Sequence, residues 1–272
     1  MKSLGYFFLE RAFMRRLVER GMKALKRVHA LQQARGFLKQ EALMREKVGA
    51  VLRDAVVVGG PYAGMRYPAL VSHGSVFYSK IFGTYELELA PFFTEGMGKG
   101  YTDVVDVGCA EGYHAVGLGR LYGCRVHAFD ADPEARHACE QMAQANGVEV
   151  AVGGTCSVDA LMALDLGQRA LVLVDCEGCE LELFTPEVAR SLARHDVVVE
   201  CHDFLHLGAT ERIRDVLGAT HDVELVFSVH DDHKTYLYRV AQLEGFSLKE
   251  RRYYVMEGRP GTMAWVVARS RG

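Results

Sequence analysis

Acidic residues and glycines alternate with apolar runs between residues 104 and 132 in a way that suits ligand binding. Asp106 ends an apolar run, and Gly108 and Gly112 occupy the turn that follows; Asp130 ends a second apolar run. If both runs are parallel strands, these residues meet at the carboxyl edge of the sheet, where open α/β sheets bind ligands. Glycine lets a ligand approach the backbone, and Asp130 can accept hydrogen bonds from ribose hydroxyls. The pattern predicts a nucleoside cofactor.

The carboxylate ahead of the glycines narrows the choice of cofactor. Asp106 can receive an ammonium group, whereas it would repel the pyrophosphate of a dinucleotide. The spacing is also Asp-x-Gly-x-x-x-Gly, in contrast to the Gly-x-Gly-x-x-Gly of nicotinamide enzymes. S-adenosylmethionine carries both a ribose and an ammonium, so it is the predicted cofactor. A nicotinamide-dependent oxidoreductase is the rival enzyme class.

A second acidic cluster follows the fourth and fifth predicted strands. Asp175 ends the fourth strand and Glu177 follows it, while Glu200 and His202 end the fifth. Carboxylates that crowd together repel one another and raise their pKa values, which suits a general base, unless a cation neutralises them. These four residues are the predicted catalytic groups. Glu180, in the next turn, is interpreted as a first-turn helix residue whose charge suits the helix dipole.

Methyl transfer from a sulfonium to an alcohol is the chemistry expected of this cluster. Such a displacement needs the nucleophilic oxygen aligned with the methyl group and a base that takes its proton. Asp175, Glu177 or His202 could accept that proton. In the alternative, Asp175, Glu200 and His202 bind a divalent ion that acidifies the hydroxyl, and these ligands suit Mg²⁺ or Mn²⁺ better than zinc. A structural role for Asp175, as a helix cap, is the other alternative.

Cysteine and histidine patterns add little to this chemistry. Cys176 and Cys179 form a C-x-x-C pair inside the acidic cluster, which could indicate redox or metal chemistry, but no second pair follows. The seven cysteines are scattered through predicted core elements, so reduced thiols and a cytoplasmic location are expected. The His-Asp-Asp-His run at 230–233 is expected to form a solvated loop.

Apolar strand-like runs alternate with helical patterns from residue 102 onward. This alternation predicts parallel crossovers and a doubly wound, mostly parallel seven-stranded sheet, a Rossmann-like α/β fold. The last two strands lack a clear helix between them and are expected to pair as an antiparallel edge. The predicted strands are 103–107, 125–130, 148–152, 170–175, 196–201, 222–228 and 263–268. The predicted helices are 112–122, 133–146, 157–165, 180–193 and 208–217.

The N-terminal segment differs from the rest of the chain in charge. Residues 1–50 hold 12 Lys and Arg against 4 Asp and Glu, a balance of +8, within a chain whose net charge is −3. Apolar residues recur there every three or four positions, which predicts a basic amphipathic helical extension over 1–53. The extension is expected to pack on the domain, to form a homodimer, or to make a peripheral membrane contact. Nucleic acid is not an expected partner, because aromatic residues are not interleaved with the basic ones.

The remaining chain divides into two predicted parts. Residues 54–100 form a connector or lid segment, with a short strand at 56–58 and a helix that begins after Tyr85. Residues 101–272 form the domain that binds the cofactor. No apolar run approaches the roughly 20 residues needed to span a bilayer.

Several stretches, in the right order, resemble the FkbM-type S-adenosylmethionine-dependent methyltransferases. They cover most of residues 54–268 and leave residues 1–50 outside. The most specific is the Asp-x-Glu-Gly-x-Glu element at 175–180. The matching stretches are GPYAGMRYP (60–68), FGTYELEL (82–89), VVDVGCAEGYHAVGLGR (104–120), HAFDADP (127–133), ANGV (145–148), LVDCEGCELELF (173–184), VVVECHD (197–203) and GRPGTMAWVVA (258–268).

The resemblance implies a reaction and a set of cofactor contacts. The reaction is O-methylation of a hydroxyl on a sugar, lipid or polyketide-type product. Tyr85 and Glu86 would lie near the amino-acid end of the cofactor. The residues that would bind the cofactor itself are Asp106, Gly108, Gly112 and Asp130.

Together these patterns predict a class I methyltransferase fold with an N-terminal helical extension. The predicted activity is S-adenosylmethionine-dependent methyl transfer to a hydroxyl of a sugar, glycan or natural product, with a small-molecule or glycan acceptor as partner. The rival outside the enzyme classes is a non-catalytic methyltransferase-like adaptor that its basic N-terminal helices recruit to a membrane or partner.

Overall fold

The computed structural model describes residues 36, 38–96 and 100–272. These residues belong to two units, which meet in sequence between Ala50 and Val51. In the first unit, residues 38–47, which are part of the predicted helical extension, are helical. Helix α2 (Gly49–Asp54) begins in the first unit and ends in the second. The rest of that extension, residues 1–35 and 37, lies outside the described residues.

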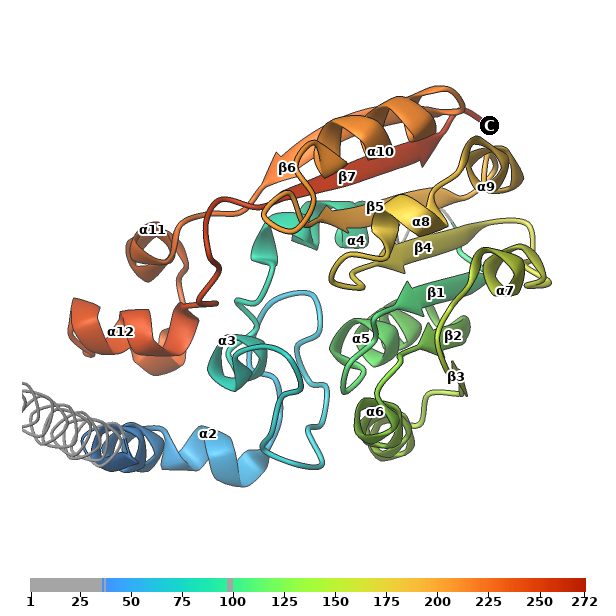
Figure 1. The fold of residues 1–272 in the computed structure, drawn as a ribbon. Helices are drawn as coiled ribbons and strands as arrows, with labels where there is room; N and C mark the ends of the chain where they lie inside the picture. Colours follow the sequence, from blue (N-terminus) through green and yellow to red (C-terminus); the bar gives the residue numbers. More distant parts are fainter. Residues whose placement is uncertain (1–35, 37, 97–99) are drawn as a thin grey trace, which may run out of the picture. The chain divides into compact units, whose positions relative to one another are not determined.

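A seven-stranded sheet lies at the centre of the second unit (Figure 1). Its strand order is β3-β2-β1-β4-β5-β7-β6. Strands β1 to β5 pair in parallel, whereas β7 runs antiparallel to both β5 and β6. The doubly wound, mostly parallel sheet predicted from the sequence is therefore confirmed. The strands are β1 Asp103–Val107, β2 Arg125–Phe129, β3 Val150–Gly153, β4 Ala170–Val174, β5 Asp196–Cys201, β6 His221–Phe227 and β7 Ala264–Ser270.

Helices cover both sides of this sheet. On one side, residues of α7 (Val158–Met162), α8 (Glu180–Leu183), α9 (Pro186–Ser191) and α10 (Ala209–Gly218) share a buried apolar cluster with alternate residues of β1, β4 and β5. On the other side, α5 (Tyr113–Tyr122) contacts β1 and β2, and α6 (Pro133–Asn146) contacts β3. Because both faces are covered, β1, β4 and β5 are buried along their whole length, as continuous apolar strands require.

Capping residues set where several helices begin. The Asp132 side chain accepts a hydrogen bond from the Glu134 amide at the start of α6, where Pro133 is the first helical residue. Ser157 caps α7 in the same way through the Ala160 amide. Short polar side chains at this position satisfy amides that the helix leaves unpaired. These local signals explain why α6 has the predicted bounds.

The helix predicted at 180–193 is wrong as a single element. It divides into α8 and α9 because Pro186 has no amide hydrogen to donate and its ring obstructs the preceding turn. Thr185 caps α9 by accepting a hydrogen bond from the Val188 amide. Proline as the first residue of α9 is the position at which helices tolerate it best.

The segment between β6 and β7 also differs from the expectation. It contains α11 (Asp231–Leu237), a short 3₁₀ turn η3 (Ala241–Leu243) and α12 (Leu248–Val255). The run at 230–233 is not a solvated loop, because His230 caps α11 by accepting a hydrogen bond from the Asp232 amide. Strand β7 then returns between β5 and β6, so β6 forms one edge of the sheet and β3 forms the other.

The segment at 54–100 contains more helix than strand. Its predicted strand at 56–58 is reduced to one isolated bridge between Val56 and Arg66. Helix α3 (Phe77–Ile81), the 3₁₀ turn η1 (Leu87–Leu89) and α4 (Ala90–Gly96) follow, so the helix expected after Tyr85 is present. The side chain of Asn146 bonds to both the amide and the carbonyl of Arg66, which fixes this segment to the end of α6.

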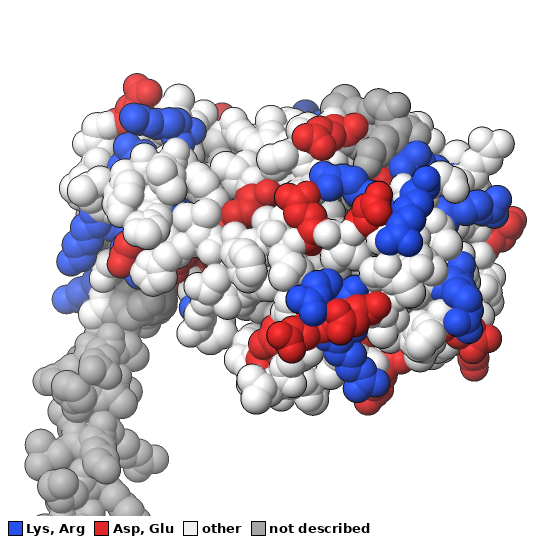
Figure 2. Space-filling view, turned by 90° about the horizontal axis from the view of Figure 1, so that it is seen from above, with Lys and Arg blue, Asp and Glu red and all other residues white. Residues whose placement is uncertain are grey.

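Charged side chains of both signs are interspersed over the face seen in Figure 2. Half-buried Arg269 of β7 pairs with Glu224 of β6, and exposed Arg271, just after β7, pairs with Asp222 of β6. Among the described residues, no helix combines the length and the apolar character that crossing a membrane requires.

Candidate active site

A cavity of about 560 Å³ opens at the carboxyl ends of β1, β2, β4 and β5. This is the edge at which open α/β sheets bind ligands. The structure brings two predicted groups of residues together at this cavity: those around the glycine turn after β1 and the acidic residues after β4 and β5. All predicted site residues except Gly112 line the cavity: Tyr85, Glu86, Asp106, Gly108, Asp130, Asp175, Glu177, Glu200 and His202.

The glycine turn joins the two halves of the cavity. Gly108 has a φ of +88°, and a Cβ atom there would lie 1.6 Å from the carbonyl oxygen of Asp175. Only glycine therefore allows the turn after β1 to contact the turn after β4. Gly112 is the N-cap of α5 with a φ of +90°, and a Cβ there would lie 2.9 Å from the sulfur of Cys139. Gly112 thus serves the packing of α5 on α6, and its predicted contact with a cofactor stays a prediction.

Asp106 presents an unpartnered buried oxygen to the cavity. It is 2% exposed, and its Oδ2 atom has no hydrogen-bond partner among the described residues. Burial raises the pKa of Asp106 to about 6, against the opposing influence of His114. A buried carboxylate oxygen without a hydrogen-bond partner is unfavourable, so a ligand that brings a positive charge would stabilise it.

Asp130 is held in place by the backbone on both of its oxygens. Oδ2 accepts from the Ala110 amide at 2.9 Å, and Oδ1 accepts from the Asp132 amide at 2.8 Å. Each carboxylate oxygen has two lone pairs, so these contacts leave Asp130 able to accept further hydrogen bonds. This orientation fits the predicted role of accepting ribose hydroxyls.

Glu86 lies on the opposite wall in a left-handed conformation, with a φ of 47°. Its two oxygens have different partners, because Oε2 lies 2.9 Å from Nε2 of His114 and Oε1 accepts from Arg259 at 2.7 Å. Burial opposes ionisation, but these hydrogen bonds and charges hold the pKa of Glu86 well below its usual range. The neighbouring ring of Tyr85 packs edge-on against Tyr113 and lies under Lys80.

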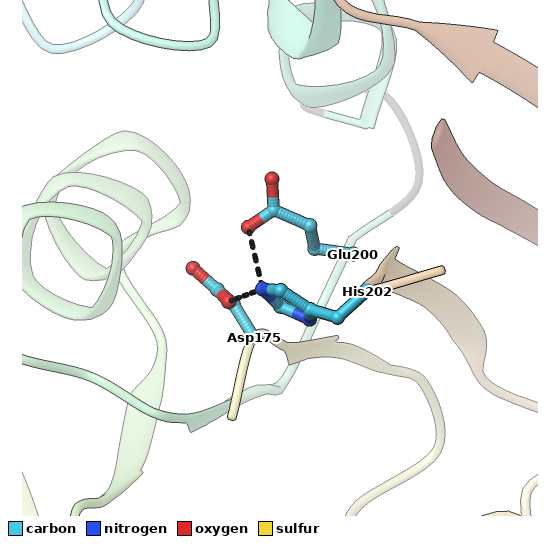
Figure 3. A group of neighbouring side chains, drawn as sticks. All are labelled: Asp175, Glu200 and His202. Carbon is cyan, nitrogen blue, oxygen red and sulfur yellow. Dashed lines mark ion pairs between the residues drawn. The ribbon is translucent and has the colours of Figure 1, made fainter. Parts of the chain in front are cut away.

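The acidic cluster combines Asp175, Glu200 and His202, which point toward one another in Figure 3. Nε2 of His202 lies 3.5 Å from Oδ1 of Asp175 and 3.9 Å from Oε2 of Glu200. Asp175 Oδ1 is buried and has no hydrogen-bond partner among the described residues. The sequence therefore predicted this grouping correctly, although its three members come from two different strands.

Repulsion and burial set the protonation of the cluster. Burial, together with the charge of Glu86, raises the pKa of Asp175 to about 7. Burial and the charge of Asp175 also raise the pKa of Glu200 above its ordinary value. His202 is buried, which would lower its pKa, but its hydrogen bond to Glu180 and the surrounding carboxylates raise it. All three groups thus have pKa values above their ordinary ones, the direction that the sequence analysis expected for crowded carboxylates.

Glu180 orients His202, a role that its position in the first turn of α8 did not reveal. Its Oε1 atom lies 2.8 Å from Nδ1 of His202. The same carboxylate accepts hydrogen bonds from the amides of Cys176 and Gly178. Glu180 is almost fully buried, so its contacts extend well beyond an interaction with the helix dipole. Glu177, by contrast, is exposed at the rim and lies outside the group of three.

Arg259 is the main site residue that the sequence analysis missed. Its guanidinium contacts Glu200, Glu86 and Glu257, and it lies 4.7 Å above the ring of Trp265. These carboxylates overcome burial and raise the pKa of Arg259 above its ordinary value. One guanidinium therefore links the Glu86 wall to the acidic cluster. The Gly-Arg-Pro-Gly stretch at 258–261 entered the sequence analysis only as part of the family resemblance. Arg259 was assigned no role there, because the carboxylates that Arg259 contacts are distant in sequence.

Glu257 extends this ion network to the helices between β6 and β7. Its carboxylate contacts Nζ of Lys234, a fully buried lysine of α11, and accepts from the Glu86 amide at 3.0 Å. Lys234 also lies 3.3 Å from Glu88. The α11 helix, whose first turn was expected to be a solvated loop, therefore supports the wall of the site.

A second missed residue, Glu111, attaches the segment at 72–80 to the domain. Its buried carboxylate accepts hydrogen bonds from Lys80 at 2.6 Å, from the Ser72 hydroxyl at 3.0 Å and from the His73 amide at 2.9 Å. It also accepts from the hydroxyl of Tyr67. Residues 73–75 and Lys80 line the cavity, so the predicted connector contributes one wall.

Cys176 and Cys179 are joined by a disulfide, which contradicts the expected reduced thiols. The bridge closes the turn between Asp175 and Glu180, and both cysteines line the cavity. The other described cysteines are free: Cys109, Cys124, Cys139, Cys156 and Cys201. The sequence signal was the spacing, because two intervening residues bring the α-carbons to 5.5 Å, within the range that a disulfide spans.

The acidic cluster also groups three side chains that could hold a divalent cation. Asp175, Glu200 and His202 each offer one ligand atom, and these atoms lie within 4.8 Å of one another. Two carboxylates and one imidazole suit Mg²⁺ or Mn²⁺, and the unpartnered Oδ1 of Asp175 gives one ligand that no protein group satisfies. Arg259 donates a hydrogen bond to Oε1 of Glu200. The other oxygen, Oε2, faces His202.

Comparison with known proteins adds fold-level similarity alone. No family model and no curated protein matches this sequence. Among solved structures, precorrin-6y C5,15-methyltransferase from Geobacter metallireducens is 14% identical with a TM-score of 0.44, and the match covers 66% of this chain and 87% of that one. Geranyl diphosphate methyltransferase in complex with GPP and sinefungin is 13% identical with a TM-score of 0.42, covering 71% and 82%. The bifunctional kinase-methyltransferase WbdD is 17% identical with a TM-score of 0.43, covering 67% and 38%.

The strand order itself defines the fold. Five parallel strands in the order β3-β2-β1-β4-β5, followed by an antiparallel β7 between β5 and β6, form the sheet of the class I methyltransferase fold. This is the fold class predicted from the sequence.

Proposed function

We propose that this protein is an S-adenosylmethionine-dependent methyltransferase that methylates a hydroxyl group of a sugar, glycan or natural product. The observation that carries the proposal is the unpartnered, buried Oδ2 of Asp106 at the cavity. A ligand ammonium would neutralise that carboxylate, whereas a diphosphate would add a second negative charge beside it. Asp130, oriented by two amides, would accept the ribose hydroxyls of the same ligand.

The acidic cluster would supply the base. The acceptor oxygen attacks the methyl carbon, the carbon–sulfur bond breaks, and its electron pair remains on sulfur to give S-adenosylhomocysteine. The hydroxyl proton passes to Nε2 of His202, whose other nitrogen donates to Glu180. Asp175, whose Oδ1 lies 3.5 Å from the same Nε2, would stabilise the imidazolium that forms. Such positioned proton transfer is worth about 10²–10⁴ in rate.

Metal assistance is a second candidate, favoured by the grouping of three ligand atoms. Asp175, Glu200 and His202 would hold Mg²⁺ or Mn²⁺, which supplies a positive charge that lowers the pKa of a bound hydroxyl. Titration of the protein with Mn²⁺ by calorimetry, beside a Glu200→Gln variant, tests this directly. Binding that the variant loses supports the metal site, and the absence of binding removes it.

Cofactor binding is the first experiment. Calorimetry with S-adenosylhomocysteine should show binding to the wild-type protein and about 10²-fold weaker binding to Asp106→Ala, because a buried charge pair is lost. Asp159→Ala, which removes an exposed acid of α7, is the matched control and should bind normally. Unchanged affinity in Asp106→Ala would contradict the assignment. Quenching by reduced nicotinamide cofactor, without S-adenosylhomocysteine binding, would favour the oxidoreductase.

Turnover is the second experiment. Transfer of a labelled methyl group from S-adenosylmethionine to a panel of sugars and glycosides should be lost in Asp175→Asn and in His202→Ala, while both variants retain cofactor affinity. Retained turnover in both variants would remove the acidic cluster from the mechanism. A protein that transfers no methyl group to any alcohol, yet sediments with vesicles through residues 1–50, would fit the adaptor hypothesis.

A further inference from the structure

The loop after β5 exposes three large apolar side chains within four residues. Phe204 is 57% exposed, Leu205 48% and Leu207 99%. Elsewhere in the described chain, exposed large hydrophobic residues occur singly or as the pair Tyr236–Leu237. Single exposed apolar residues are ordinary, but a contiguous group at a cavity suggests a binding surface.

The loop is held in a fixed shape, so this exposure is built into the fold. Asp203 accepts hydrogen bonds from the amides of Gly208 and Thr210 and from the Thr210 hydroxyl. At the other end, the amides of Leu205 and His206 both bond to the carbonyl of His202. The Asp203 carboxylate is thereby hydrogen-bonded within the loop, while the apolar side chains of Phe204, Leu205 and Leu207 are exposed to solvent.

The apolar loop is continuous with the acidic cluster. Phe204 lines the cavity, and its ring packs edge-on against the ring of His202 at 5.6 Å between centroids. Leu205 lies close to the disulfide-closed turn. A Cβ atom added to Gly178 in that turn would lie 3.6 Å from Cδ1 of Leu205. Met263 lines the same cavity and contacts Arg259. An acceptor whose hydroxyl lies at His202 would therefore place its neighbouring atoms on Phe204.

We infer that the 204–207 loop is an acceptor-binding platform, and that the acceptor is an amphipathic alcohol with an apolar portion beside its reacting hydroxyl. This inference rests on the proposed function, and it chooses an apolar-bearing acceptor over a free sugar or a wholly polar glycan. Phe204 and Leu205 contact the apolar portion, while Leu207 extends the platform outward. Burial of apolar surface supplies the binding energy, and His202 selects the hydroxyl.

The test compares two probes that share one hydroxylated head, glucose and octyl glucoside below its micelle concentration. Binding to the S-adenosylhomocysteine-loaded protein is measured by calorimetry, and labelled methyl transfer is measured in parallel. The platform predicts at least about tenfold tighter binding of the octyl glycoside, and a loss of about tenfold in Phe204→Ser. Where transfer occurs, KM should rise and kcat should stay the same. Leu248→Ser, an exposed leucine of α12, is the matched control and should change neither.

Two results would overturn the platform. One is equal binding of both probes, and the other is an octyl glycoside affinity that Phe204→Ser leaves unchanged. If that affinity is unchanged and Leu207→Ser releases the protein from phosphatidylcholine vesicles that bind the wild type, the loop is a lipid anchor. The proposed function fails differently, because a protein that binds octyl glucoside through Phe204 but neither binds S-adenosylhomocysteine nor transfers a methyl group keeps the platform and loses the reaction.

Discussion

The acidic side chains on the two sides of the cavity differ in their partners. On the side of β1 and β2, Asp106 is left without a partner on one oxygen and Asp130 is held only by backbone amides. On the side of β4 and β5, Glu200 contacts Arg259 and His202 contacts Glu180. The first side thus has negative charge available to a ligand, whereas the protein itself balances most of the charge on the second.

This difference teaches how binding and chemistry are separated in the fold. A substitution on the β1 and β2 side should change ligand affinity and its pH dependence, because a ligand completes the charge there. A substitution on the β4 and β5 side should change stability and turnover, because buried ion pairs are broken when one partner is removed. The four predictions below test that separation.

The largest effect is expected for Arg259→Met. The variant leaves Glu86, Glu200 and Glu257 without their shared guanidinium, and loss of one partner of a buried pair costs about 3–5 kcal/mol. The deficit in the free energy of unfolding, measured by urea denaturation at pH 8, should shrink at pH 5, where protonation neutralises the carboxylates. Arg214→Met, which breaks only the exposed pair with Asp215, should cost less than about 1 kcal/mol. Equal deficits would remove Arg259 from the centre of the network.

Next in size is the effect of the His202 environment on turnover. His202→Ala should lower kcat by about 10²–10⁴ without changing S-adenosylhomocysteine affinity. Since the base must be neutral, kcat of the wild type should rise with pH as His202 deprotonates, and Glu180 raises the pKa of His202. Glu180→Gln should therefore move that rise to lower pH. Exposed Glu182→Gln provides the control. An unmoved profile in Glu180→Gln would exclude Glu180 as a positioning residue.

Asp106→Asn should make the protein more stable and its cofactor binding weaker. The pKa of Asp106 is raised to about 6 from an unfolded value of 3.8, so its contribution to stability is fully present below pH 3.8 and is lost as pH rises toward 6. Above that pH the asparagine variant should gain up to about 3 kcal/mol in the free energy of unfolding.

The same group gives cofactor binding a pH dependence. An ammonium bound at Asp106 favours its ionised form, so wild-type affinity for S-adenosylhomocysteine should rise from pH 5 to pH 7, and Asp106→Asn should lack this rise. A pH-independent wild-type affinity would show that the ligand charge does not meet Asp106.

The smallest effect is expected for the disulfide. Cys176→Ser with Cys179→Ser opens a four-residue loop, whose closure is worth about 2 kcal/mol or less because the loop is short. Glu180 still bonds the amides of Cys176 and Gly178, so kcat should fall only a few-fold and cofactor affinity should stay the same. Cys124→Ser, which changes a free cysteine, is the control. Loss of cofactor binding in the double variant would mean that the two sides of the cavity are not separate.

The fold was predictable because its signals are local. Strands β1, β4 and β5 are covered on both faces, so their sequences are continuous apolar runs whose ends are easy to locate. Asp106 and Asp130 were predictable for the same reason, because one strand–helix–strand unit fixes both positions. The break between α8 and α9 had a local signal too, in Thr185 followed by Pro186, which the apolar periodicity of 180–193 concealed.

The residues that sequence reasoning missed act through distant partners. Arg259 lies 173 positions from Glu86 and 59 from Glu200, and its Gly-Arg-Pro-Gly surroundings indicate only a turn. Glu111 reads as part of the turn after β1, although it fixes residues 72–80. Charge balance within a buried network depends on which segments the sheet brings together, so it becomes visible only when the fold is complete.

The close contact of Gly108 with the backbone of Asp175 has an evolutionary consequence. Any side chain at position 108 pushes directly on the carbonyl that precedes the disulfide-closed turn, so a single mutation there distorts the turn after β1 and the turn after β4 at once. Related sequences that lose glycine at this position should also carry a rebuilt turn after β4, and the two sites should change together or stay fixed together.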